Sequence, residues 1–238
     1  MSEVALVVIA KAPEPARSKT RLCPPCTPEQ AAALAEAALA DTLAAVVAVP
    51  ARRRILALDG RPGPWLPRGV EVVAQRGDGL GERLGHALED AGGPALVIGM
   101  DTPQLCPALL AFAAGTLVRP EIDAVIGPAV DGGYWTIGLQ RPDAAAFNGV
   151  PMSSSATCRE QRRRLDEIGL RTAELPRLRD VDDIVDAHAV AEAWPETRFA
   201  RTLGAVLRSG AAGDAPKSRR PVPVADDRVV NERRRPGW

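Results

Sequence analysis

The sequence predicts an α/β protein, a three-layer α/β/α sandwich around a mostly parallel, mixed sheet. Short apolar runs alternate along the chain with Ala- and Leu-rich helical stretches, which is the pattern of strand–helix–strand units. Two of these runs, 123–130 and 134–140, are joined only by the sequence DGG. That connection is too short for a crossover, so it predicts a hairpin and one antiparallel strand in the sheet.

The strands and helices of the first half follow one another closely. The run 4–10 is apolar at nearly every position, as in a buried parallel strand. After a long loop, Thr27 is a good N-cap, with Pro28 at the first helical position and Gln30 completing a capping box, and this helix is expected to reach about Val49. Further on we expect strands over 54–58, 70–75 and 94–100 and a helix over 79–91.

In the second half, the hairpin strands precede a helix near 154–168, a strand near 171–175 and a helix near 182–194. From Ser209 the sequence is rich in Pro, Gly and charge and shows no periodicity. We therefore expect one domain over 1–208, followed by a disordered Pro/Arg-rich tail over 209–238.

Composition narrows the partners. The 238 residues are 46% hydrophobic, which is enough for a full core. Lys plus Arg and Asp plus Glu number 30 each, so no broad basic surface attracts nucleic acid, and any cationic site must be local. No basic region precedes the first apolar run, and Glu36 and Asp41 interrupt the longest one. We expect a cytoplasmic protein without a membrane partner, a monomer or homodimer, with its four cysteines as free thiols.

The loop after the first strand is the first candidate site. It is longer than the roughly 2–6 residues usual between a strand and a helix, and such loops are often functional. It carries Lys11, Lys19 and Arg21, and a helix N-terminus follows at Thr27. Cations near the positive end of a helix suit a polyphosphate. A solvated basic loop is the alternative. The loop has no glycines, so it is not a Walker A loop.

Asp101 is the second candidate. It comes directly after an apolar strand, and an unpaired carboxylate cannot be buried cheaply, so it must emerge at the sheet edge. There it is well placed to ligate Mg²⁺, which prefers oxygen ligands shared with phosphates. The alternative is a helix N-cap, by Asp101 or Thr102, for residues 104 onward. Between 180 and 186 four further aspartates either complement a helix dipole or supply a second metal ligand, and the sequence alone leaves this open.

The pair Cys23 and Cys26 suggests redox or zinc chemistry. Zinc needs four ligands, and the remaining Cys and His residues form no second pair at a suitable spacing. A thioredoxin-like pair would sit directly at a helix start after a strand, whereas this one lies far down the loop. We interpret the two prolines between the cysteines as stiffening the loop.

Five stretches together resemble the DUF2064 family, which belongs to the GT-A-type nucleotide-diphospho-sugar transferase superfamily and is similar to 2-phospho-lactate guanylyltransferases. They are, in family order, IAKAPEPARSKTRL, GLGERL, VIGMDTP, GPAVDGGYWTIGL and DVDDIVD, and they span roughly residues 4–200. The resemblance implies a GT-A-like nucleotidyltransferase fold that binds a nucleotide and a divalent metal, Mg²⁺ or Mn²⁺. This chain departs from the family pattern with Ala16, Met152 and Asp183.

The resemblance also implies roles for individual residues. Asp101 and Asp182 would hold the metal, and Lys19 and Arg21 would act with Asp101 in catalysis. The remaining roles fall into two groups, one for the nucleotide and one for the acceptor. Nucleotide binding would involve Lys11, Pro13, Lys19, Thr20, Arg21, Gly79, Gly81, Glu82 and Arg83, and acceptor binding Asp131, Gly132, Gly133, Tyr134 and Ser153.

Three hypotheses for function follow. The first is a metal-dependent nucleotidyltransferase that moves NMP from an NTP to a phosphate- or phosphonate-bearing small molecule. The second is a GT-A glycosyltransferase using an NDP-sugar, although one Asp stands here where such enzymes usually have D-x-D. The third is a non-catalytic nucleotide-binding protein.

Overall fold

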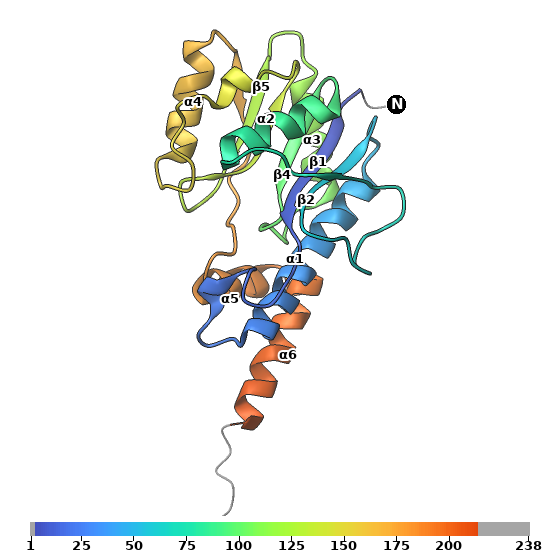
Figure 1. The fold of residues 1–238 in the computed structure, drawn as a ribbon, viewed down its shortest axis with the longest axis vertical. Coiled ribbons are helices and arrows are strands. Elements are labelled where there is room, and N and C mark those ends of the chain that lie inside the picture. The colour runs from blue at the N-terminus through green and yellow to red at the C-terminus, as the bar shows by residue number, and fades with distance from the viewer. Residues whose placement is uncertain (1–2, 214–238) are drawn as a thin grey trace, which may run out of the picture.

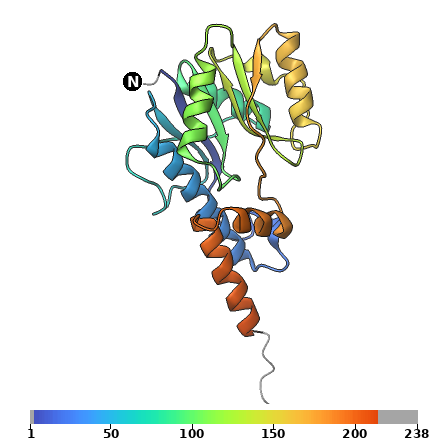
Figure 2. The same ribbon diagram turned by 180° about the vertical axis from the view of Figure 1, so that it is seen from behind.

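The structure, a computed structural model, describes residues 3–213 (Figures 1 and 2). Within them the strands form one seven-stranded sheet, in which β6 runs antiparallel to both neighbours and every other pair is parallel. This confirms the predicted fold class and the hairpin strand. In spatial order the strands are β3 (Glu71–Ala74), β2 (Arg54–Asp59), β1 (Ala5–Lys11), β4 (Ala95–Gly99), β6 (Tyr134–Leu139), β5 (Ala124–Pro128) and β7 (Thr172–Glu174).

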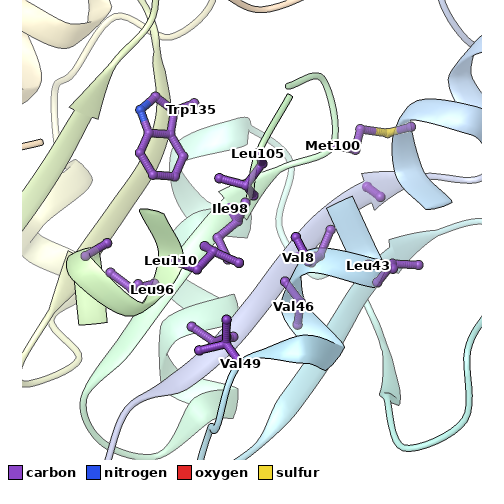
Figure 3. Close-up of a cluster of buried hydrophobic side chains, with 14 of the residues drawn as sticks. Val8, Leu43, Val46, Val49, Leu96, Ile98, Met100, Leu105, Leu110 and Trp135 are labelled. Carbon is purple, nitrogen blue, oxygen red and sulfur yellow. The ribbon is translucent and has the colours of Figure 1, made fainter. Parts of the chain in front are cut away.

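Helices cover both faces of the sheet. On one face, α1 (Pro28–Ala48) and α3 (Pro107–Leu117) pack on Leu6 and Val8 of β1, and Figure 3 shows the aliphatic cluster that results. On the other face, α2 (Leu80–Ala91), the short 3₁₀ helix Ala144–Phe147 and α4 (Thr157–Glu167) pack on Ala5 and Val7. Successive β1 residues enter opposite cores because strand side chains alternate, which makes the three layers.

α1 links the sheet to a second group of helices. Its start is fixed by the predicted capping box, with Gln30 N donating to Thr27 Oγ1 and Thr27 N to Gln30 Oε1. The N-terminal half of α1 packs against α5 (Ile184–Ala193) and α6 (Arg198–Gly213), beyond one edge of the sheet (Figures 1 and 2). By length and composition α1 could cross a membrane, but 61% of its apolar window is buried inside this fold, as expected of a core helix.

The sequence analysis erred at two helices. α3 starts at Pro107, with Cys106 at the N-cap and no side-chain cap, so neither Asp101 nor Thr102 caps it. α6 was not predicted, and it continues past the boundary placed at Ser209. Phe199 and Leu203, one helical turn apart, are its buried contacts with α1 and α5. The rest of the predicted tail, 214–238, lies outside the described residues.

The outer edge of the sheet carries a pH-dependent contact. Arg171, just before β7, donates from Nε and Nη2 to both carboxylate oxygens of Asp123, just before β5, at 2.7 and 3.0 Å. These hydrogen bonds lower the pKa of Asp123 to about 2, below its value of roughly 3.9 in an unfolded chain. A lowered pKa stabilises the fold above the unfolded pKa, and this contribution disappears as the pH falls through the folded pKa.

We therefore expect Arg171→Met to lower the Tm at about pH 6 and to have a smaller effect at about pH 3. The pair is largely exposed, so the difference at pH 6 should be small, about 2 °C. Thermal unfolding of both proteins across that range measures it. A Tm difference that stays constant with pH would contradict the assignment.

Candidate functional site

The sheet edge where β1 and β4 end carries a cavity of about 630 Å³. Its lining comes from the sheet, the loop after β1, the start of α2, and the chain near Ser153 and Asp182. Ligands of open α/β sheets bind beyond the carboxyl ends of the strands, and this cavity has that location. The predicted site residues that line it are Lys11, Lys19, Thr20, Arg21, Arg83, Asp101, Tyr134, Ser153 and Asp182.

The loop after β1 is shaped by a few buried contacts. Ser18 is buried, and its hydroxyl donates to the carbonyl of Ala12 at 2.9 Å. Lys19 follows in the left-handed region with φ of 51°, and the 3₁₀ turn Thr20–Leu22 begins there. Leu22 is fully buried in the cluster formed with α1, α5 and α6. The loop is therefore held at both ends, and the residues between them face the cavity.

Lys19 joins the two predicted metal ligands. Its side chain is only 10% exposed, and Nζ lies 2.7 Å from Asp101 Oδ1 and 3.8 Å from Asp182 Oδ1. Nζ also donates to the carbonyl of Val181. Val181 N in turn donates to the carbonyl of Asp101 at 2.9 Å, and Arg21 Nη1 lies 3.1 Å from Asp182 Oδ2. Four residues selected from distant parts of the sequence thus meet at one point.

Beside this group lies an acidic cluster formed by Asp131, Asp180 and Asp182. One carboxylate oxygen from each lies within 4.8 Å of the others. Burial of Asp180, followed by the charge of Asp131, raises the pKa of Asp180 to about 6. Three converging carboxylates that repel one another fit a divalent cation, since Mg²⁺ and Mn²⁺ take oxygen ligands. The sequence analysis had put Asp131 with the acceptor and did not select Asp180.

The two remaining aspartates of this segment have structural partners. Asp183 is the N-cap of α5, and its Oδ1 accepts from Val185 N at 2.8 Å and Asp186 N at 3.0 Å. Asp186 pairs with Arg179 at 2.8 Å. The question that the sequence left open is thus divided: Asp182 turns toward the cavity, while Asp183 and Asp186 serve the helix.

The DGG turn supports the cavity from outside. Asp131, Gly132 and Gly133 do not line it, whereas Tyr134 does. Gly132 has φ of +93°, and a Cβ there would lie 2.1 Å from the carbonyl oxygen of Ser155, so the turn and the loop before α4 touch backbone to backbone. Tyr134 donates to Gln161 Oε1 at 3.2 Å, and burial raises the pKa of Tyr134.

The start of α2 contributes Arg83. Of its predicted companions, Gly79 is the N-cap of α2 and Glu82 accepts from Asp78 N at 2.9 Å. Gly81 packs near Phe147, because a Cβ at Gly81 would be 3.4 Å from Phe147 Cβ. None of these three lines the cavity, and neither does Pro13, within the part of the chain that the structure describes.

Gln75 and Asp59, which the sequence analysis missed, hold Arg83. Gln75 Nε2 donates to the carbonyls of Ala10 and Ala57 at 2.8 and 3.0 Å, and its Oε1 accepts from Arg83 Nη1 at 3.2 Å. Asp59 Oδ2 accepts from the same Nη1 at 3.2 Å. Gln75 therefore joins the ends of two strands to a cavity-lining cation. Its place just after β3 was the only sequence signal for it.

We expect Gln75→Leu to weaken nucleotide binding at this site about 10-fold, because it frees Arg83 and leaves two strand-end carbonyls without a donor. Titration calorimetry with Mg²⁺ and each NTP measures the effect. Arg76→Leu is the matched control, because Arg76 points away to Asp90, at 2.6 Å. If both variants bind alike, Gln75 does not position this wall.

The four cysteines are free thiols. Cys26 is buried against Leu22 and the start of α1, and burial, followed by the charge of Cys23, raises its thiol pKa. The only metal-ligand group found within residues 3–213 consists of carboxylates. The cysteines thus take part in packing beneath the loop.

Solved structures similar to this chain are nucleotide transferases. A protein of Desulfovibrio desulfuricans G20, described as a candidate nucleotide-diphospho-sugar transferase, is 28% identical over 89% of this chain and 96% of its own, with a TM-score of 0.77. CMP:2-keto-3-deoxy-manno-octonic acid synthetase, solved with CTP, is 12% identical over 82% and 99%, with a TM-score of 0.55. For 2-C-methyl-D-erythritol 4-phosphate cytidylyltransferase of Thermus thermophilus the figures are 16%, 80%, 98% and 0.50. The last two establish a shared fold only.

One family profile also matches. It is that of the uncharacterized proteins conserved in bacteria, DUF2064, and it covers residues 33–154, half of the chain. It includes Asp101 and the DGG turn, whereas Lys19, Asp180 and Asp182 lie outside the matched range. No curated protein matches the sequence.

Proposed function

Because this chain belongs to the DUF2064 family of bacterial proteins and has the fold of nucleotide transferases, we propose that it is a metal-dependent nucleotidyltransferase. It transfers NMP from an NTP to a phosphate- or phosphonate-bearing small molecule and releases pyrophosphate. The observation that carries the proposal is the meeting of Lys19 with Asp101 and Asp182 at the edge of one cavity. Basic and acidic groups at one point are what a metal–polyphosphate complex needs.

The chain's cations bind the triphosphate. Lys11, Lys19 and Arg21 line the same cavity, from the end of β1 and the loop that follows it. Their charges balance the β- and γ-phosphates and the pyrophosphate that leaves. Such a transfer needs no side-chain nucleophile, because positioning and charge stabilisation supply the rate enhancement.

The carboxylates hold the metal, Mg²⁺ or Mn²⁺. Asp182 is central, because it belongs to the acidic cluster and also faces the same ammonium as Asp101. When bound, the metal polarises the α-phosphate and bridges it to the acceptor oxygen. Asp131 and Asp180 complete the oxygen ligands on the side where Tyr134 and Ser153 bound the acceptor region.

Thermal shift measurements test this proposal. The chain is heated with each NTP, and with UDP- and GDP-sugars, in the presence and absence of Mg²⁺. We expect stabilisation by an NTP that requires the metal, and we expect Asp101→Ala to lose it. Equal NTP-dependent shifts in Asp101→Ala and the parent would overturn the site, and an unchanged Tm with every ligand would overturn the function.

A glycosyltransferase using an NDP-sugar is the second candidate. The Desulfovibrio protein favours it, because its description names this class of enzyme. Stabilisation by an NDP-sugar with metal, and none by an NTP, identifies this activity. Both activities use nucleotides that the cytoplasm supplies, and we place the protein there.

A further inference from the structure

The strongest contact in the cavity joins groups that the proposed reaction keeps apart. Lys19 is a phosphate ligand in that reaction, and Asp101 and Asp182 are metal ligands. Without a ligand, the Lys19 ammonium contacts both carboxylates and the Val181 carbonyl instead. Its side chain is 10% exposed, so it is held there and not spread over the surface.

We infer that Lys19 is a built-in substitute for the metal, a latch that couples metal binding to phosphate binding. The inference rests on the proposed function and adds its regulation. The ammonium neutralises Asp101 and Asp182 while the site is empty. A divalent cation must displace it, and a triphosphate offers the displaced ammonium a new partner.

The coupling follows from charge. A cation placed between Asp101 and Asp182 would repel an ammonium that lies 2.7 Å from one of them and 3.8 Å from the other. Metal alone therefore has to release Lys19 to the solvent, and nucleotide alone has to draw it from two carboxylates. With both present, neither cost remains. By linkage each ligand raises the affinity of the other by the same factor.

The backbone holds the two carboxylates independently of the ammonium. Val181 N donates to the carbonyl of Asp101, and Gln104 Nε2 donates to the carbonyl of Arg179 at 2.5 Å. The segment that carries Asp182 is thus tied to the chain after β4 by bonds that do not involve Lys19. Removing the charge of Lys19 should leave a ready cation site.

The test is a titration of the full chain with Mn²⁺ alone, followed by the loss of the free-ion signal in electron paramagnetic resonance. We expect Lys19→Gln to bind Mn²⁺ at least about 10-fold more tightly than the parent, within the usual range of coupling factors. Gln keeps a donor for the Val181 carbonyl. Lys11→Gln is the matched control, because it removes a cation from the same cavity, and no ion pair of Lys11 is found among the described residues.

Lys11→Gln should change Mn²⁺ affinity by less than about 3-fold, which reflects only the general field of the cavity. Lys19→Gln with Asp101→Asn should lose the gain. Lys19→Met, checked with Lys19→Gln for an unchanged unfolding transition, excludes an effect of misfolding. Unchanged or weaker Mn²⁺ binding in both Lys19 variants, equal gains at Lys11 and Lys19, or no Mn²⁺ binding by any protein would overturn the latch.

The two proposals fail separately. The titration contains no nucleotide and no acceptor, so a gain in Lys19→Gln stands whether or not an NTP is the substrate. Conversely, metal-dependent NTP stabilisation with no gain in Lys19→Gln leaves the nucleotidyltransferase in place and removes the latch.

Discussion

Asp182→Asn is expected to abolish the metal-dependent stabilisation by nucleotide and to lower any transfer activity by about 100-fold or more. Asp182 faces Lys19 and Arg21 on one side and belongs to the acidic cluster on the other. An amide of the same shape keeps the packing but removes a charged metal ligand, and such losses are large. Thermal shifts with Mg²⁺ and NTP, and calorimetry with the metal, measure them.

The neighbouring residue supplies the control. Asp183→Asn makes the same chemical change one position along the chain, where the side chain caps α5. Asn caps helices about as well as Asp, so the unfolding free energy should change by less than about 0.5 kcal/mol, and nucleotide binding should persist. If the two variants lose binding equally, Asp182 has no special position in the site.

Gly132→Ala is expected to cause the largest loss of stability among these variants, about 3 kcal/mol. The residue has φ of +93°, which strains any side chain, and the added Cβ would lie 2.1 Å from a backbone oxygen of Ser155. Backbone cannot rotate away as a side chain can, so the loop before α4 has to move. Asp131 moves with the turn, and metal affinity should fall as well. Thermal unfolding should show a Tm lower by roughly 10 °C.

Gly149→Ala separates strain from collision. Gly149 has φ of +75°, but a Cβ there meets nothing within 4 Å. It should cost only the backbone strain, about 1 kcal/mol, and leave metal binding unchanged. Equal losses at Gly132 and Gly149 would show that the contact with Ser155 carries no cost.

Much of the fold follows from local sequence. The buried strands are continuous apolar runs, and α1 begins at a capping box, so each element was visible without its neighbours. α6 was missed because its buried side is narrow. Phe199 and Leu203 are its main contacts, and the residues between them are polar or small. The start of α3 was misplaced because Asp101 and Thr102 are good caps by residue type, whereas the chain turns at Pro107.

The sequence by itself determined that cations follow the first strand and that Asp101 ends a buried one, since both statements depend only on neighbouring residues. Only the tertiary structure decided which charges meet. It brought Lys19 onto Asp101 and Asp182, joined Asp131 with Asp180, and let Gln75 hold Arg83. The physical reason is that the segment carrying Asp180 and Asp182 reaches the site only when the chain returns from β7 across the sheet edge. Such a return depends on how the whole sheet is ordered, which no short stretch of sequence encodes.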